Sequence, residues 1–371
     1  MVIDPKSTLT SAIIEQLHRL GHRIAQSGLL DLLAAYGCEE ERQDTLRFDI
    51  AFLPRKLASA VNLLVLGDAI KLTEAEEILG ADGIETLLAL ELAKHEFDSL
   101  HLPNLRLIRH FGVMLFCQQP AITARFYYGN DSLALGRLLL PVRGDVLDLC
   151  AGVGTQGLLC ALTAQRVVSV EVQAEVAKLY AINSALNGLE EKMELRIGNL
   201  LEAVYDERFD RVCCNPPLLP VPHSLPYPPV GDGGEDGLTI IRRVVSHLST
   251  LLTPTGSCQI IGTVVGNEAE AAFQELEDLA EDQELSIQLI VPWREQLEAQ
   301  SPLVRSLALT ISQYGNLPYE VALHELLASY QAMQVRYLYS FLLLAHRASA
   351  RGEAGLVLTH HYLRGSSFWS V

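Results

Sequence analysis

The protein has 371 residues, of which 49% are hydrophobic and 20% are charged, and its formal net charge is −17. A chain of this length and apolar content is long enough for two domains. Nucleic-acid binding depends on a basic surface that neutralises phosphates, and no Lys/Arg cluster occurs here, so no nucleic-acid partner is expected.

Seven cysteines occur without a Cys-x-x-Cys pair, several of them in apolar segments. This usage is typical of buried, reduced thiols in a cytoplasmic protein. The chain does not open with a basic segment followed by an apolar core, and charges interrupt its apolar stretches before they reach a membrane span. We therefore expect a cytoplasmic protein without a membrane partner. The sequence also lacks a His-Glu-x-x-His motif or a Cys/His cluster, so no metal is expected.

Residues 1–125 are predicted to form a mainly helical accessory domain. Capping and breaking residues predict helices over 11–20, 29–36, 55–66, 73 to about 79, and 84–92, with Thr73 as an N-cap. Strands are expected over 100–102 and 105–109 around a turn, with a third over 112–117. Helices followed by a small hairpin resemble a winged-helix module. Because this hairpin carries only Arg106 and Arg109, we expect a substrate lid or a homodimer surface rather than a DNA-binding face.

Residues 126–371 alternate between strand and helix patterns, which predicts an α/β domain with a doubly wound, Rossmann-like sheet. Seven strands are expected, at 145–149, 166–171, a segment ending near 197, 209–214, 256–262, 285–291 and 355–361. A helical insertion is expected at about 300–350, between the last two strands, with helices over 319–333 and 335–347. Such an insertion can form a wall of the substrate site or pair two subunits.

A glycine-rich turn follows the first of these strands. Gly152, Gly154 and Gly157 satisfy the pattern G-x-G-x-x-G, which nicotinamide and flavin enzymes also contain. Glu171 ends the next strand, 19 positions after Gly152, where a carboxylate can accept hydrogen bonds from both ribose hydroxyls of an adenosine cofactor. Asp148 adds a second carboxylate, placed where the ammonium group of a bound amino acid can lie.

Asn215-Pro216-Pro217-Leu218 follows the strand predicted at 209–214. Two successive prolines cannot donate backbone hydrogen bonds or continue a strand, so the chain must enter a rigid turn. This turn lies at the carboxyl end of a strand, where open α/β sheets bind their ligands. The amide oxygen of Asn215 and the carbonyl of Pro216 can hold the N–H hydrogens of an amine or amide. Alternatively, the two prolines only end a strand.

Three motifs occur in the order found in one enzyme family: Asp148-x-x-x-Gly152-x-Gly154, Glu171, and Asn215-Pro216-Pro217. They resemble the class I S-adenosylmethionine (SAM) methyltransferases, in the small-domain branch that methylates adenine amines and the glutamine amide of release factors. Gly233-Gly234-Glu235-Asp236-Gly237-Leu238 also resembles the segment after the Asn-Pro-Pro loop in the glutamine methyltransferases. The resemblance covers about residues 126–300 and implies a seven-stranded Rossmann-like sheet with SAM as cofactor.

The resemblance implies roles for particular residues. The implied cofactor-binding residues are Asp131, Asp148, Gly152, Gly154, Glu171, Asn199, Leu200 and Asn215. The implied catalytic residues are Asn215 and Pro216, and the candidate substrate-binding residues are Tyr128, Pro217, Leu218, His223 and Tyr227. Asp131 can instead cap a helix, and His223 can instead be a surface side chain.

Two positions depart from the family pattern. Leu218 replaces an aromatic residue that stacks on flat substrates, which disfavours a nucleobase. Asn199 replaces an aspartate that accepts from the adenine amine, although its amide oxygen can still accept.

The expected function is SAM-dependent methyl transfer to a nitrogen of a small-molecule or peptide amine or amide. The alternatives are a protein glutamine methyltransferase and a small-molecule O- or C-methyltransferase. Less favoured are a nucleic-acid adenine or guanine methyltransferase, a nicotinamide dehydrogenase and a non-catalytic scaffold.

Overall fold

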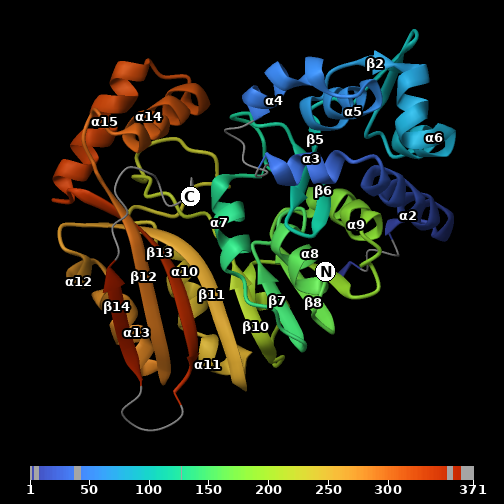
Figure 1. The fold of residues 1–371 in the computed structure, drawn as a ribbon. Coiled ribbons are helices and arrows are strands. Elements are labelled where there is room, and N and C mark those ends of the chain that lie inside the picture. The colour runs from blue at the N-terminus through green and yellow to red at the C-terminus, as the bar shows by residue number, and fades with distance from the viewer. Residues whose placement is uncertain (1, 4–7, 37–42, 127, 349–353, 361–371) are drawn as a thin grey trace. The chain divides into compact units, whose positions relative to one another are not determined.

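The computed structural model describes residues 2–3, 8–36, 43–126, 128–348 and 354–360 (Figure 1). The chain divides into two compact units. Unit 1 comprises residues 1–120, 124–143 and 151–199, and unit 2 comprises residues 121–123, 144–150 and 200–371.

Unit 1 begins with helices. They are α2 (Ser11–Gln26), α3 (Leu29–Ala35), α4 (Gln43–Asp49), the 3₁₀ turn η2 (Ile50–Phe52), α5 (Arg55–Ala60), the π-helical turn η3 (Val61–Leu66) and α6 (Leu72–Ala89). The hydroxyl of Thr10 caps α2, which buries Leu17, Leu20 and Ile24 along one stripe facing α6 and α9. Thr73 was predicted to be an N-cap, but it lies within the first turn of α6 because Lys71 is the N-cap residue.

Two small antiparallel sheets follow. One has the order β2 (Ile70–Lys71), β4 (Ser99–His101), β3 (Lys94–Glu96), and the other pairs β5 (Leu105–His110) with β6 (Val113–Gln118). The predicted pairing of 100–102 with 105–109 is therefore wrong. The two-residue connection between His110 and Val113 closes the β5–β6 hairpin locally, whereas β4 pairs with β2 and β3.

The rest of unit 1 contains α7 (Asn130–Leu138), α8 (Thr155–Ala161), β8 (Arg166–Glu171), η4 (Ala174–Val176), α9 (Ala177–Leu186) and β9 (Met193–Ile197). β8 and β9 pair in parallel, and the short strand β1 (Val2–Ile3) pairs with β9 in the antiparallel direction.

Unit 2 contains a mixed sheet. Its strands, in spatial order, are β7 (Asp145–Leu149), β10 (Phe209–Cys214), β11 (Leu252–Gly266), β13 (Tyr337–Arg347), β12 (Leu285–Gln296) and β14 (Gly355–His360). β13 is antiparallel to both of its neighbours, and the other neighbouring pairs are parallel.

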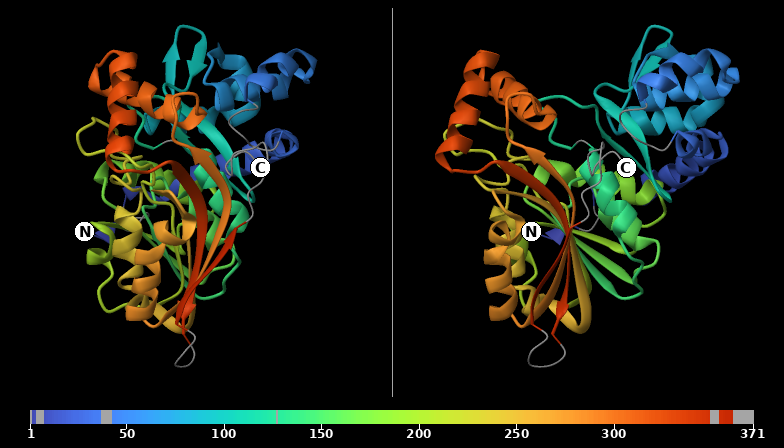
Figure 2. Two further views of the ribbon diagram at one scale, coloured as in Figure 1. Left: turned by 90° about the vertical axis from the view of Figure 1, so that its left-hand side faces the viewer. Right: turned by 60° about the vertical axis from the view of Figure 1, so that its left-hand side comes forward.

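The first helical segment of unit 2 is the 3₁₀ turn η5 (Leu200–Ala203). One face of the sheet is covered by four helices: α10 (Thr239–Val245), α11 (Leu248–Leu251), α12 (Ala269–Ala272) and α13 (Gln274–Asp282) (Figure 2). Beyond the ends of β12 and β13 lie α14 (Pro302–Gly315) and α15 (Tyr319–Ala332) (Figure 1). This pair of helices is called the helical hairpin below.

β13 overturns one expectation, because 335–347 was predicted to be helical. Its leucine-rich run has high intrinsic helix propensity, but both of its edges are hydrogen-bonded, to β11 and to β12. Leu338, Phe341 and Leu343 are fully buried there, so tertiary context overrides the local preference. Each predicted strand is present within the described residues, and β13 is additional to them. The predicted helix at 319–333 is confirmed, whereas 302–315 was not predicted to be helical.

Candidate functional site

The glycine-rich turn and the end of β8 meet within unit 1. Gly152 N donates a hydrogen bond of 2.9 Å to Glu171 Oε2, and the backbone amides of Val172 and Gln173 donate to Oε1, also at 2.9 Å. Glu171 is 7% exposed, so these donors replace the water that its carboxylate would otherwise bind. A carboxylate has about four lone-pair sites, and acceptor capacity therefore remains for a ligand hydroxyl.

The backbone of the turn is shaped for close approach. Gly152 has φ +52°, and a Cβ placed on it would meet no atom within 4 Å, so its backbone borders open space. Gly154 has φ +89°, and a Cβ there would lie 3.0 Å from the ring of Tyr180. Both positions therefore favour glycine, and the turn fits a cofactor that approaches the main chain.

Asn183 of α9 ties this turn to β6. Its Nδ2 donates to the carbonyls of Val153 at 3.2 Å and Phe116 at 3.0 Å, and its Oδ1 accepts from Phe116 N at 2.8 Å. Asn187, one helical turn later, makes the same two-way contact with Met114. The two asparagines thus satisfy the open edge of β6 in the way a neighbouring strand would. Sequence reasoning missed them because the contacts are long-range.

A buried polar chain connects β5, α7 and α8. Tyr128 bonds through its hydroxyl to His110 Nδ1 at 2.8 Å, and Gln156 Oε1 lies 3.4 Å from His110 Nε2. Gln156 Nε2 also donates to Ser132 O at 2.8 Å. Burial lowers the pKa of His110 to about 4, so the imidazole is neutral at physiological pH. Tyr128 is 1% exposed, and its hydroxyl lies in this chain.

Two further cofactor candidates of unit 1 have different surroundings. Asp131 is the second residue of α7 and is half-buried, while the N-cap position belongs to Gly129. Asn199 is exposed and follows β9. In unit 2, Leu200 is 6% exposed and begins η5 with φ +54°.

Asp148 and the strand that precedes Asn215 are neighbours in unit 2. β7 and β10 run in parallel with Asp148 opposite Cys213, whose thiol donates to Asp148 Oδ1 at 3.5 Å. Asp148 is 1% exposed. Burial also raises the pKa of the Cys214 thiol, which therefore stays protonated.

The Asn-Pro-Pro turn leaves β10 immediately after Cys214. Asn215 and Pro217 are half-buried, while Pro216 and Leu218 are buried. The carbonyl of Leu218 accepts a hydrogen bond from the Thr263 hydroxyl of β11. Leu218 is therefore part of the packed interior, and the turn is fixed to the neighbouring strand.

The glycine-rich segment 233–238 holds the chain that follows. A Cβ on Gly233 would lie 2.7 Å from the carbonyl carbon of Leu218, so only glycine fits there without a backbone shift. Gly233 N donates to Leu219 O at 2.9 Å, and Gly234 O accepts from Val221 N at 2.9 Å. The backbone hydrogen bonds of this segment therefore hold the residues after the turn in place.

Arg242 of α10 anchors the same segment. Asp236 accepts from two guanidinium nitrogens of Arg242, and Glu275 accepts from Arg242 Nε at 2.6 Å. Asp236 Oδ1 also accepts from Leu238 N at 3.0 Å, at the start of α10. The acidic partners raise the pKa of Arg242 against the opposing effect of its burial.

His223 and Tyr227 lie in the proline-rich loop, defined here as residues 219–229. His223 is exposed. Tyr227 is half-buried and packs against the helical hairpin, and burial raises the pKa of its phenol to about 12. Tyr227 is therefore neutral at physiological pH, with a hydrogen bond to Thr310 of α14.

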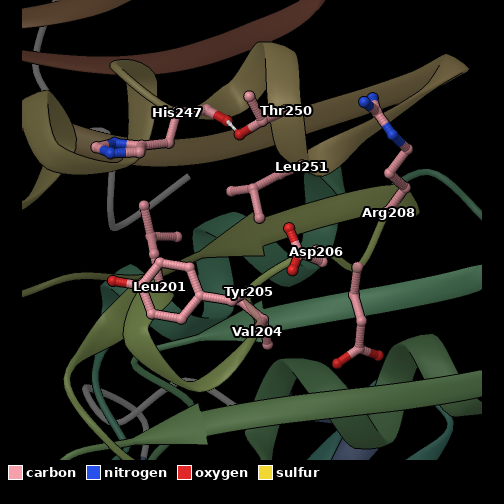
Figure 3. A pocket seen from close by; sticks show the side chains of 9 residues that line it. Leu201, Val204, Tyr205, Asp206, Arg208, His247, Thr250 and Leu251 are labelled. Carbon is pink, nitrogen blue, oxygen red and sulfur yellow. Dashed lines mark hydrogen bonds between the residues drawn. The ribbon is translucent and has the colours of Figure 1, made fainter.

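A surface pocket of about 360 Å³ lies elsewhere in unit 2 (Figure 3). Its lining residues are Leu201, Val204, Tyr205, Asp206, Glu207, Arg208, His247, Thr250 and Leu251. Arg208 precedes the first residue of β10, whereas Asn215 follows the last, so six strand residues separate the pocket from the Asn-Pro-Pro turn. That separation is roughly 20 Å along the strand, so the Arg208 end of the pocket lies far from the Asn-Pro-Pro turn.

The described ranges lack a metal cluster and a membrane-spanning helix. Across these residues, no group of three or more His, Cys, Asp or Glu side chains could hold a metal ion. Within the same part of the chain, every helix is too short or too polar to cross a membrane.

The chain is similar to known methyltransferases. The family model described as the methyltransferase small domain matches residues 131–288. A ribosomal protein uL3 glutamine methyltransferase of Bordetella pertussis is 32% identical over 165 residues, which cover 41% of this chain and 54% of that protein. A Methanocaldococcus jannaschii protein, provisionally named a protein N5-glutamine methyltransferase, is 30% identical over 172 residues, which cover 45% of this chain and 85% of that protein.

Another relative is also named a glutamine methyltransferase. A release factor glutamine methyltransferase of Clostridium acetobutylicum is 32% identical over 124 residues, covering 30% of this chain and 44% of that protein. Among solved structures, the YcgJ protein of Bacillus subtilis has a TM-score of 0.40 at 15% identity, over 60% of this chain and 99% of that protein.

A mixed α/β sheet, a glycine turn bonded to a strand-end glutamate and an Asn-Pro-Pro turn define a class I methyltransferase. The chain belongs to the family of SAM-dependent methyltransferases that carry the methyltransferase small domain. It spans about half of the length of the uL3 glutamine methyltransferases that it matches, 54% and 46% in two cases.

Proposed function

We propose that this protein transfers the methyl group of SAM to the side-chain amide nitrogen of a glutamine in a protein substrate. The observation that carries the proposal is the Asn-Pro-Pro turn, fixed at the end of β10 in a chain whose relatives are named glutamine methyltransferases. Leu218 at the fourth position is buried and offers no aromatic face, which favours an amide over a nucleobase.

The residues proposed to hold SAM fit its chemistry. Glu171 has acceptor capacity for ribose hydroxyls, and the backbone at Gly152 and Gly154 permits close approach. Asp148 is the proposed partner of the ammonium group, and Asp131, Asn199 and Leu200 complete the proposed set. When bound, SAM supplies a methyl group on a sulfonium, which is already a good leaving group, so catalysis depends mainly on positioning.

Asn215 and Pro216 are proposed to act on the acceptor amide. The Asn215 oxygen and the Pro216 carbonyl accept the two amide hydrogens, and this orients the nitrogen lone pair. Positive charge develops on the nitrogen as the new N–C bond forms, and the same acceptors stabilise it. A proton leaves the nitrogen after transfer, so no strong base is needed. Pro217, Leu218, His223, Tyr227 and Tyr128 remain proposed substrate-side residues.

The remaining proposals concern the domain organisation, the location and the partners of the protein. Residues 1–125 are proposed as an accessory domain separate from a methyltransferase domain at 126–371. The antiparallel sheet β2-β4-β3 after several helices supports a winged-helix-like form. We further propose a cytoplasmic protein that does not bind nucleic acid and that can form a homodimer.

Methyl-labelled SAM tests the proposal. The enzyme is incubated separately with purified ribosomal protein uL3, a purified release factor, total RNA and a small-molecule extract. Label in a protein fraction supports the proposal. Label only in RNA or only in the small-molecule extract contradicts it, and calorimetry with SAM alone checks cofactor binding in every case.

A further inference from the structure

We propose that the helical hairpin is a positioning element for the Asn-Pro-Pro turn, and that Tyr330 of α15 is the positioning residue that fixes the proline-rich loop after the turn. This inference rests on the proposed function of that turn. The hairpin spans residues 302–332 and lies outside residues 131–288, which match the family model.

The proline-rich loop needs outside partners. It contains five prolines in eleven residues, none of which can donate a backbone hydrogen bond. The loop therefore cannot hold itself in place as a strand or a helix would. A bond of 2.9 Å from Leu225 N to Pro222 O closes a turn inside the loop, whereas the carbonyl of buried Pro220 accepts from another element, and leaving it unpaired would be costly.

Three consecutive carbonyls next to the turn are each held by a different element. Leu218 O accepts from the hydroxyl of Thr263, and Leu219 O accepts from Gly233 N at 2.9 Å. Pro220 O accepts from the hydroxyl of Tyr330 at 2.8 Å. Only the third of these bonds comes from the helical hairpin, and it joins residues 110 positions apart in the chain.

The hydroxyl of Tyr330 is buried and keeps the proton that it donates to Pro220 O. Its side chain is 1% exposed and belongs to the core that α14 and α15 share, with Val304, Leu307 and Leu326. Burial raises the pKa of its phenol above its ordinary value, so the hydroxyl keeps its proton across the physiological range. The hydroxyl is therefore available as a donor to Pro220 across this range.

The rest of the loop also packs on the hairpin. Leu219, Leu225 and Tyr227 contact the same shared core. A Cβ on Gly315, at the end of α14, would lie 2.3 Å from Pro226 Cγ, so the ring of Pro226 packs directly on the backbone of Gly315. The hairpin thus contacts the loop at its start, through Pro220, and near its end, through Pro226.

The position of Pro220 bears on Asn215 because the chain between them is stiff. Pro216 and Pro217 have fixed φ angles, and Leu218 is tied to β11. The bond at Pro220 continues the anchoring that Thr263 and Gly233 begin at Leu218 and Leu219, so its loss is expected to loosen the chain that holds Asn215. Small displacements of an orienting group cost large factors in rate, so the hairpin tunes turnover without touching the cofactor.

Tyr330→Phe removes the hydroxyl and keeps the ring, so the hairpin core stays filled. Tyr314→Phe is the matched control, because Tyr314 lies on α14 of the same hairpin and is 45% exposed. We expect Tyr330→Phe to lower kcat about tenfold for the protein substrate that the labelling experiment identifies, with an unchanged KM for SAM. Tyr314→Phe is expected to match the wild type in both quantities.

Hydrogen–deuterium exchange gives a second readout that does not need activity. In Tyr330→Phe, the amides of Leu219 and Val221 should exchange several times faster than in the wild type, and those of β10 should not change. Equal exchange and equal kcat in the two variants would overturn the inference, as would faster exchange with an unaltered kcat. If the wild type methylates no glutamine, the proposed function fails, and the exchange rates alone then decide whether Tyr330 holds the loop.

Discussion

Gly152 N lies 2.9 Å from Glu171 Oε2, and this bond joins the glycine-rich turn to the end of β8. The contact gives Glu171 a structural role in the turn beside its proposed role in binding the ribose. The residue proposed to bind the ribose is thus itself held rigid by three backbone amides.

Glu171→Gln should weaken SAM binding. The amide keeps one oxygen but loses the charge and one acceptor, and a hydrogen bond to a charged group contributes roughly 1.5–3 kcal/mol. The dissociation constant measured by calorimetry should rise by roughly tenfold to a hundredfold. Glu175→Gln is the control, since Glu175 is exposed and forms an ion pair of 3.2 Å with Arg125, which is also exposed. Equal affinity in the two variants would remove Glu171 from the cofactor site.

Asp148→Asn should also weaken SAM binding without unfolding the protein. The substitution keeps the shape of a side chain that is 1% exposed beside Cys213, so the packing of β7 on β10 is preserved. The affinity loss expected from one charged partner is again roughly tenfold or more. Calorimetry measures it, and a thermal melt checks the fold. Normal affinity with an intact fold would refute the proposed ammonium contact.

Gly233→Ala should lower both stability and turnover. The new Cβ would lie 2.7 Å from the carbonyl carbon of Leu218 and 2.9 Å from its Cα, so the backbone next to the Asn-Pro-Pro turn must move. Overpacking of this kind typically costs about 1–3 kcal/mol, which urea unfolding can measure. Gly112→Ala is the control, because its Cβ would meet only the flexible end of Leu162. A fully active Gly233→Ala enzyme would show that the segment does not hold the turn.

Acid should destabilise the protein through His110. The folded state keeps His110 neutral, with a pKa of about 4, whereas the unfolded chain binds the proton below about 6.5. Between these values the unfolded state binds more protons, so the free energy of unfolding falls as the pH is lowered from 6.5 to 4. The total loss from this residue is roughly 3 kcal/mol.

Unfolding in urea at several pH values measures this slope. His110→Gln should be less stable at pH 7, because it disturbs the bond to Tyr128, but its stability should depend less on pH in this window. His95→Gln serves as the control, since His95 is exposed. A slope that His110→Gln leaves unaltered would show that His110 does not titrate as described.

Local patterns predicted the ends of β7, β8 and β10, and with them the positions of Asp148, Glu171 and Asn215 in the chain. These strands are short apolar runs that end in turn-forming residues, so the sequence signal and the structure agree. β13 was assigned wrongly because a leucine-rich run does not distinguish a buried strand from a helix. Its pairing with β11 and β12 is decided by residues far away in the chain.

The long-range contacts of the site could not be predicted from local sequence patterns either. The bonds from Asn183 to Val153 and from Tyr330 to Pro220 join elements that no periodicity connects. Gly233 belongs to a recognisable motif, but only the structure shows that a side chain there would collide with the backbone of Leu218. Sequence reasoning thus found the residues that carry chemistry more readily than those that hold them in position.

Asn215→Ala should separate cofactor binding from turnover. Its amide is proposed to contact the substrate, so the affinity for SAM should stay normal. Loss of one oriented acceptor should lower the single-turnover rate by about 10²–10³, by analogy with a lost oxyanion-hole donor. Asn267→Ala is the control, because Asn267 is exposed at the end of β11. A near-normal rate in Asn215→Ala would point to an oxygen or carbon acceptor instead.

The central claim is that the acceptor atom is a glutamine amide nitrogen, and fragment mass spectrometry of the methylated protein substrate tests it most directly. The wild-type reaction should place one added methyl group on a glutamine side chain, and acid hydrolysis should release it as methylamine. Methyl groups found on a carboxylate, a hydroxyl or a carbon, with glutamine unmodified, would contradict the account.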